Sequence, residues 1–227
     1  MGLDTSVECV LFDLDGTLID TAADFIAVLR QLSVENNRLP VTDVSVQHNV
    51  SDGARALVKL AFEIEENDDR FTHLNQRLLE LYLEQLANTE ATPYPGILSL
   101  LEQLETANIP WGIVTNKPEI YSLKLLEKLN LLSRCGVLVC PDHVTERKPH
   151  PEPIFLACDS LSCGTERTVY MGDHIRDIQA AKNADVIAVA AAYGYLSPDA
   201  KVEEWSADFI LRSSEQALPL LNTLKFA

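Results

Sequence analysis

Short apolar runs alternate with amphipathic stretches along most of this chain, and that alternation limits the folds open to it. The apolar runs are typical of buried strands and cover residues 9–12, 111–115, 137–140, 168–171, 187–191 and 207–211. Between most of them, apolar residues recur at helical spacing, in residues 97–106, 122–132, 153–161 and 175–184. Strands that alternate with helices build a parallel sheet covered on both faces, so the sequence predicts an α/β fold.

The alternation is interrupted between about residues 21 and 92, where no strand-like run occurs. Apolar residues at helical spacing predict three helices in this stretch, at 22–32, 53–64 and 68–86. We therefore expect an all-helical insertion at residues 19–91 and an α/β core made of residues 1–18 and 92–227. The alternative is that these helices simply pack on the sheet.

Two carboxylates follow the first predicted strand. Asp13 and Asp15 stand two residues apart and precede Gly16-Thr17, which is typical of a turn. Ligands bind at the carboxyl ends of strands in open α/β sheets. Two anions this close repel each other, and a hard cation with oxygen ligands relieves the repulsion. One carboxylate is then free to act as a nucleophile. A helical insertion directly after such a site has the right position for a lid.

Polar residues also follow later strands. Thr115 and Asn116 end the second strand, Lys148 lies in a proline-rich segment, and Asp173 ends the fourth strand with Asp177 four residues on. A hydroxyl, an amide and a lysine held on a stiff loop suit phosphate oxygens. Each residue also has a structural explanation: helix capping for Thr115 and Asn116, a solvated turn for Lys148, and charge complementarity at a helix start for Asp177.

The order of these pieces is more specific than any one of them. Asp-x-Asp-Gly-Thr, a Thr after a strand, a Lys and then Gly-Asp-x-x-x-Asp resemble the haloacid dehalogenase-like (HAD) hydrolase superfamily over essentially the whole chain. The resemblance implies a Rossmann-like parallel sheet core with an inserted all-helical cap of the first class, type C1. It also implies an enzyme, a phosphatase that hydrolyses phosphoric monoesters.

The resemblance assigns roles to the residues that match the motifs. Asp13 is the implied nucleophile and Asp15 the implied general acid and base. Thr115 and Asn116 are implied to bind phosphate, and Lys148 to steady both Asp13 and the phosphoryl group.

The implied cofactor is Mg²⁺. Its implied ligands are Asp13, Asp173 and the main-chain carbonyl of Asp15, with Asp177 as a supporting acid nearby. His174 stands where these families usually carry Ser or Asp, and its role is open.

Within the superfamily, residues 12–21, 114–118 and 193–195 resemble the phosphoglycolate phosphatase group. Residues 50–56, 140–144 and 148–153 resemble N-acetylmuramic acid 6-phosphate phosphatases more closely. The implied substrate is therefore a small phosphorylated metabolite, either that amino-sugar phosphate or phosphoglycolate. In the inserted segment, Ser51, Gly53 and Arg55 are candidates to bind its leaving group, because helix N-terminal amides and an arginine suit a carboxylate. A sugar phosphomutase on the same core and a non-catalytic phosphate-binding protein are the alternatives.

Composition excludes other partners. The formal net charge of −16 argues against extended contacts with nucleic acid or anionic lipid. No stretch approaches the length of a membrane span, and no signal peptide is expected. Five cysteines without metal-type spacing predict reduced thiols and a cytoplasmic enzyme. The oligomeric state is open.

Overall fold

The computed structural model describes residues 7–224, and a six-stranded parallel sheet lies at its centre. The strand order is β5-β4-β1-β6-β7-β8, and every neighbouring pair is parallel. Its strands are β1 (Cys9–Phe12), β4 (Trp111–Val114), β5 (Val137–Val139), β6 (Thr168–Gly172), β7 (Ile187–Ala191) and β8 (Phe209–Leu211). The prediction of an α/β fold with a parallel sheet is confirmed.

Helices cover both faces of the sheet, because side chains along each buried strand alternate between two apolar clusters. In β1, Val10 and Phe12 belong to one cluster, whereas Cys9 and Leu11 belong to the other. The first cluster also takes side chains from α5 (Ile97–Thr106), α6 (Glu119–Lys128) and α9 (Ala217–Leu224). The second takes them from α7 (Glu152–Leu161) and α8 (Ile175–Asn183).

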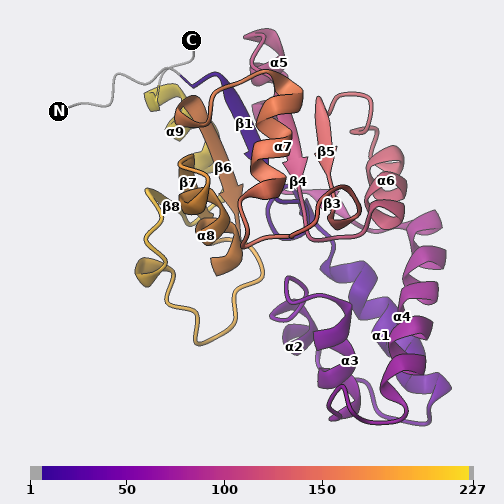
Figure 1. The fold of residues 1–227 in the computed structure, drawn as a ribbon. Helices are drawn as coiled ribbons and strands as arrows, with labels where there is room; N and C mark the ends of the chain where they lie inside the picture. Colours follow the sequence, from indigo (N-terminus) through magenta and orange to yellow (C-terminus); the bar gives the residue numbers. More distant parts are fainter. Residues whose placement is uncertain (1–6, 225–227) are drawn as a thin grey trace.

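The remaining helices form a separate group, which we call the helical unit. It consists of α1 (Ala22–Glu35), α2 (Asp43–Gln47), α3 (Ala54–Phe62) and α4 (Phe71–Gln85), and residues 21–91 contain no strand. Its buried leucines, such as Leu29, Leu57 and Leu78, continue the first apolar cluster of the sheet. Figure 1 shows this unit beyond the ends toward which β1, β4 and β6 point.

A two-stranded antiparallel ribbon carries the chain into and out of the helical unit. It pairs β2 (Ile19–Asp20) with β3 (Thr92–Pro93). The boundaries predicted for the insertion fall in this ribbon, and the division into two domains stays a prediction. Among residues 7–224, no helix combines the length and the apolar character needed to cross a bilayer.

Candidate active site

Three polar residues predicted from the sequence lie at one edge of the sheet. Asp13 directly follows β1, Thr115 follows β4 and Asp173 follows β6. Because β1 pairs with both β4 and β6, the ends of these three strands are neighbours. In the sheet, β4 and β5 lie on one side of β1, and β6 to β8 lie on the other. The strand order therefore changes direction beside β1. Open α/β sheets bind ligands at such a switch point.

Three buried carboxylates meet at this edge. Asp13, Asp173 and Asp177 each offer an oxygen, and these oxygens all lie within 4.8 Å of one another. Asp177 is placed by the first turn of α8, where its Oδ2 accepts a hydrogen bond of 3.0 Å from the backbone N–H of His174. Asp177 therefore turns back from α8 toward the end of β6.

A fully buried lysine joins two of these acids. The Lys148 ammonium lies 3.0 Å from Asp13 Oδ1 and 2.7 Å from Asp177 Oδ1. It also donates to the carbonyl of Val114 at 2.8 Å and to the hydroxyl of Tyr170 at 2.7 Å. With this many partners, the ammonium is held in one position beside Asp13.

The balance of charge in this group favours a bound cation. Three carboxylates face one ammonium, and burial raises the pKa of Asp13 and Asp173, the latter to about 8. Burial alone would lower the pKa of Lys148, but Asp13 and Asp177 outweigh it and the pKa is raised. A divalent cation with oxygen ligands would neutralise the excess negative charge, so the residues present fit such an ion.

Backbone N–H groups near the ends of β1 and β4 are a further feature of this edge of the sheet. Among the described residues, the N–H groups of Asp15 and Asn116 donate to no protein acceptor. Thr115 is buried, and its hydroxyl accepts a bond from the N–H of Lys117 at 3.1 Å. The side-chain amide of Asn116 donates to the Lys148 carbonyl at 3.1 Å. The main-chain N–H of Asn116, rather than its side-chain amide, is therefore the donor that remains without a protein partner.

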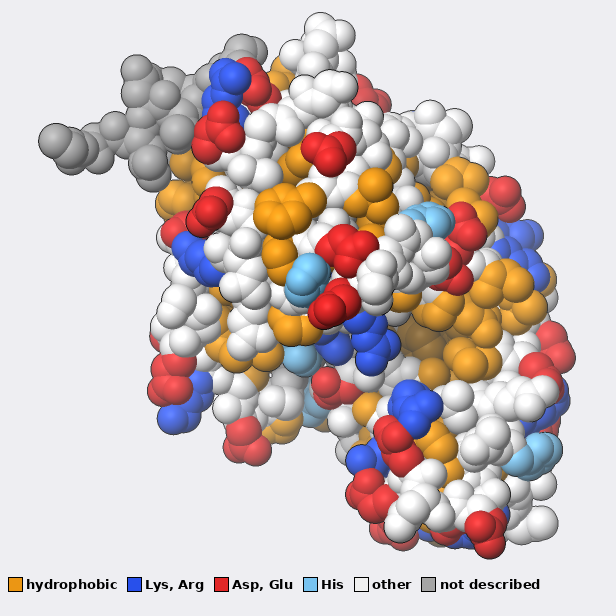
Figure 2. All heavy atoms as spheres, in the orientation of Figure 1, with side chains coloured by type: hydrophobic (Ala, Val, Ile, Leu, Met, Phe, Trp, Pro, Cys, Tyr) orange, Lys and Arg blue, Asp and Glu red, His pale blue; other side chains and the backbone are white. Residues whose placement is uncertain are grey.

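A cavity of about 870 Å³ lies between the sheet edge and the helical unit. It is lined by residues of both parts, among them eight predicted site residues: Asp13, Asp15, Ser51, Gly53, Arg55, Thr115, Asn116 and Lys148. Figure 2 shows a hollow between the two parts with basic side chains at its border. Arg55 itself is more than half exposed and forms an ion pair with Glu66.

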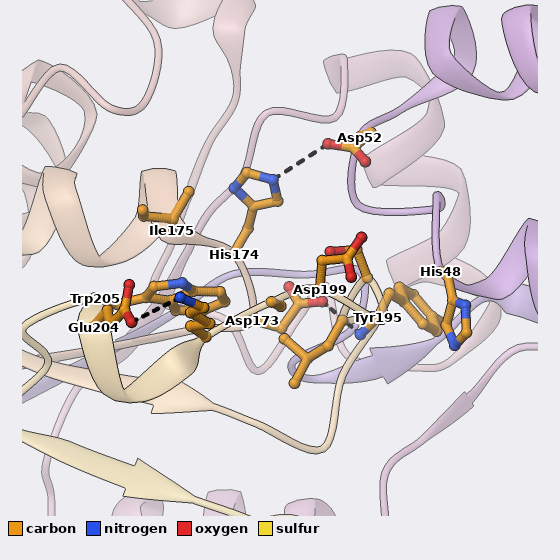
Figure 3. A pocket seen from close by; sticks show the side chains of 13 residues that line it. His48, Asp52, Asp173, His174, Ile175, Tyr195, Asp199, Glu204 and Trp205 are labelled. Carbon is orange, nitrogen blue, oxygen red and sulfur yellow. Dashed lines mark hydrogen bonds and ion pairs between the residues drawn. The ribbon is translucent and has the colours of Figure 1, made fainter.

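A loop of the helical unit reaches across to the start of α8. The Ser51 hydroxyl donates to Asp173 Oδ2 at 2.7 Å, and the Ser51 carbonyl accepts a bond from Arg176. His174 Nε2 lies 3.2 Å from Asp52 Oδ1, and Figure 3 marks this contact with a dashed line. A second cavity of about 470 Å³ lies beside these contacts, and Asp52, Asp173 and His174 are among the residues that line it. His174 therefore links the two parts and caps α8.

Comparison with known proteins identifies the family. Residues 10–191 match the model of the haloacid dehalogenase-like hydrolases. The chain belongs to this hydrolase family. The resemblance to these hydrolases that the sequence motifs indicated is thereby confirmed.

Relatives of known activity are similar to nearly the whole of this hydrolase. The N-acetylmuramic acid 6-phosphate phosphatase of Pseudomonas aeruginosa is 39% identical over 95% of this chain and 95% of its own. The phosphoglycolate phosphatase of Xanthomonas campestris pv. campestris is 39% identical over 91% of this chain and 93% of its own. The predicted class, an enzyme of the phosphatase type, is confirmed by these relatives.

Solved structures agree on the fold. A crystal structure of a predicted phosphoglycolate phosphatase from Haemophilus somnus has a TM-score of 0.83 and 24% identity, and covers 96% of this chain and 99% of its own. A haloacid dehalogenase-like hydrolase from Bacteroides fragilis has a TM-score of 0.78 and 22% identity, with 93% and 99% covered. The Rossmann-like core is thus shared with hydrolases of this family.

Sequence reasoning missed the partners of Asp15 in this hydrolase. The Asp15 carboxylate accepts a hydrogen bond from the Thr21 hydroxyl at 2.7 Å and forms an ion pair with Lys117 at 3.0 Å. Lys117 follows Thr115 by two residues, as Asp15 follows Asp13, so position relative to the strand end was the available signal. The sequence position of Tyr82 in α4 gives no such indication, because Tyr82 reaches Lys117 only through the placement of the helical unit.

Gly16 is a position where any side chain should disturb Asp173. Its φ is +78°, and an added Cβ would lie 2.1 Å from Asp173 Oδ2. We expect Gly16→Ala to lower the free energy of unfolding in urea by clearly more than the roughly 1–2 kcal/mol that backbone strain alone costs. Gly96→Ala is the control, since Gly96 has a φ of +80° but the nearest atom to an added Cβ lies 3.3 Å away. Equal losses for both variants would contradict a steric role of Gly16 beside Asp173.

Proposed function

We propose that this hydrolase is a Mg²⁺-dependent phosphomonoesterase that forms a phosphoaspartate on Asp13. One observation carries the proposal. The Asp13 carboxylate lines the large cavity while its Oδ1 lies 3.0 Å from a lysine ammonium that is wholly buried. A nucleophile held beside a fixed cation, at the edge where three carboxylates meet, suits attack on a phosphoryl group.

The proposed reaction has two displacement steps. An Asp13 oxygen attacks phosphorus, the bond from phosphorus to the leaving oxygen breaks, and Asp15 gives that oxygen a proton. Asp15 then takes a proton from water, whose oxygen displaces Asp13 and releases inorganic phosphate. Lys148, Thr115 and the N–H groups of Asp15 and Asn116 stabilise the phosphoryl oxygens in both steps.

The residues that would hold Mg²⁺ are the carboxylates of Asp13 and Asp173, with the main-chain carbonyl of Asp15. When bound, the ion would offset negative charge on the nucleophile and the phosphoryl oxygens. Asp177 is already paired with Lys148 at 2.7 Å, which supports its role as an acid beside the site rather than a ligand.

Metal and pH should act together on stability. In the metal-free protein, burial raises the pKa of Asp173 from 3.8 to about 8. Between these values the folded state keeps a proton that the unfolded chain gives up, so the free energy of unfolding falls as pH rises from about 4 to about 8. Mg²⁺ binds the ionised carboxylates, so the increase in Tm that it causes should be larger at pH near 8 than at pH near 5. Thermal scans with Mg²⁺ or EDTA check this, and an increase that is the same at both pH values would contradict it.

The helical unit is proposed to be the cap of this active site, with residues 19–91 as its extent. Its loop contacts Asp173 through Ser51, and its helices contribute the far wall of the cavity. Ser51, Gly53 and Arg55 are the residues proposed to meet the leaving group.

The size of the cavity bears on the substrate. A volume of about 870 Å³ lies in the upper part of the range of roughly 300–1,000 Å³ typical of pockets for drug-sized ligands. That is far more space than a phosphorylated two-carbon acid needs. Leu79, Tyr82 and Tyr121 add apolar wall that suits the faces of a sugar ring. We therefore favour N-acetylmuramic acid 6-phosphate over phosphoglycolate.

Substrate choice is tested by release of inorganic phosphate from a panel of phosphomonoesters with Mg²⁺. We expect kcat/KM for the amino-sugar phosphate to exceed that for phosphoglycolate by about tenfold or more, roughly 1.4 kcal/mol. The opposite order would overturn the substrate but not the reaction. Isomerisation of a sugar phosphate without release of phosphate would overturn the phosphatase in favour of a mutase.

Arg55 is expected to recognise a carboxylate on the leaving group. Arg55→Ala should lower kcat/KM for carboxylate-bearing substrates by about 1–3 kcal/mol, the scale of a hydrogen bond to a charged group, and barely affect p-nitrophenyl phosphate. Glu66→Gln is the matched control, because it frees Arg55 from its ion pair and leaves the guanidinium in place. Equal losses on both kinds of substrate would mean that Arg55 serves the phosphate or the fold instead.

A further inference from the structure

A second buried lysine, Lys117, lies between the core and the helical unit. Its side chain is 6% exposed, and its ammonium lies 3.0 and 3.1 Å from the two carboxylate oxygens of Asp15. The same nitrogen donates to the hydroxyl of Tyr82 at 2.7 Å. All three N–H donors of the ammonium therefore have partners, one of which comes from α4 of the helical unit.

Two aromatic rings of the helical unit also lie beside this ammonium. Phe25 of α1 and Tyr82 of α4 stack with ring centroids 4.3 Å apart and an interplanar angle of 8°. The Lys117 nitrogen lies 5.1 Å from the Phe25 centroid and 4.5 Å from the Tyr82 centroid, within the range of cation–π attraction. Apart from the ion pair with Asp15, the groups shown to compensate the burial of this charge therefore belong to α1 and α4.

Lys117 is also the main constraint on Asp15. Among the described residues, the Asp15 carboxylate has one other side-chain donor, the Thr21 hydroxyl at 2.7 Å. A carboxylate held by two ammonium contacts and a hydroxyl has a fixed orientation, whereas one held by the hydroxyl alone can rotate.

We propose that Lys117 is a positioning residue for Asp15, and that it acts only while Phe25 and Tyr82 are packed against it. The place of the helical unit then decides the orientation of the proton-transferring carboxylate. This inference rests on the proposed phosphatase reaction, because the orientation of Asp15 affects the rate only if Asp15 transfers protons in that reaction.

The two reaction steps separate this role from a structural one. Attack by Asp13 on p-nitrophenyl phosphate needs little help from Asp15, because p-nitrophenolate leaves without a proton. Hydrolysis of the phosphoaspartate still needs Asp15 to take a proton from water. A misplaced Asp15 should therefore leave the first step nearly intact and slow the second, so that p-nitrophenolate appears in a burst.

Stopped-flow measurement of p-nitrophenolate release in the presence of Mg²⁺ tests this for Lys117→Met and Tyr82→Phe. For Lys117→Met we expect the ratio of burst rate to steady-state rate to rise about 10²-fold over wild type, the lower end of what a general base contributes. Tyr82→Phe keeps both rings and removes one hydrogen bond, so a rise of about two- to tenfold is expected. Lys117→Arg, which keeps the charge, should restore part of the wild-type ratio.

Lys124→Met is the matched control. Lys124 also bridges the core and α4, since its ammonium donates to the Leu83 carbonyl at 3.1 Å, but it does not bind Asp15. It should keep the wild-type ratio. The proposal is overturned if Lys124→Met reproduces the effect, or if Lys117→Met slows burst and steady state equally. Should circular dichroism show Lys117→Met unfolded, an unchanged ratio in Tyr82→Phe overturns it. A wild-type protein that releases no p-nitrophenolate refutes the proposed function instead.

Discussion

Asp13→Asn is expected to abolish turnover while leaving the fold intact. An amide is a poor nucleophile toward phosphorus and a poor ligand for Mg²⁺, so kcat should fall by about 10⁴-fold or more. The measurement is hydrolysis of p-nitrophenyl phosphate with Mg²⁺, with circular dichroism as the check on folding. Residual activity within about tenfold of wild type would contradict the assignment of Asp13 as nucleophile.

The same substitution should not lower stability in the absence of metal. Asp13 belongs to a buried group of three carboxylates that one ammonium only partly neutralises, and burial raises the pKa of Asp13. Removing one negative charge relieves repulsion, while Lys148 keeps Asp177 as a partner. Asp159→Asn, an exposed change of the same kind on α7, is the matched control and should keep full activity. Thermal unfolding in EDTA separates a catalytic loss from a folding defect.

Elements with a strong local pattern could be predicted from the sequence to the residue. The strand β7 (Ile187–Ala191) and the helix α5 (Ile97–Thr106) begin and end where predicted. The strand carries a continuous apolar run, and the helix has apolar residues at clear helical spacing. The site residues Asp13, Thr115 and Asp173 could be located for the same reason, because each directly follows such a strand.

Elements that depend on distant residues could not be predicted as well. The helix predicted at 122–132 runs from Glu119 to Lys128. It begins early because the backbone N–H of Glu119 donates to Asp142 Oδ2 at 2.8 Å, a contact across 23 positions. It ends early because the chain turns at Asn130, which has a φ of +56°. The five-residue helix α2 was missed because Val46 is its single buried side chain, too few for a periodic pattern.

The same limit explains what was missed in the site. Lys117 lies within residues 114–118, which resemble the phosphoglycolate phosphatase group, yet its partners Phe25 and Tyr82 lie 92 and 35 positions away (117 − 25 and 117 − 82) on the helical unit. Only the packing of that unit against the core brings them to Asp15. Local sequence could therefore predict which residues end the strands but not which residues restrain them.

Lys148→Met should be costly for both stability and activity. The ammonium is wholly buried between Asp13 and Asp177, and its loss leaves two buried carboxylates without their cation. Removing one partner of a buried ion pair costs about 3–5 kcal/mol, so the free energy of unfolding in urea should fall by that amount without metal. The loss of charge stabilisation at the phosphoryl group should lower kcat by about 10²–10³-fold.

A second substitution separates the two effects. Lys148→Met combined with Asp177→Asn removes one of the two buried carboxylates that have lost their cation. An asparagine oxygen can still accept the hydrogen bond from the backbone N–H of His174 at the start of α8. The double variant should therefore regain part of the lost stability. It should remain as inactive as the single variant, because the cation beside Asp13 is still missing. If activity returned together with stability, Lys148 would serve the fold alone and the charge assigned to catalysis would have to come from another residue.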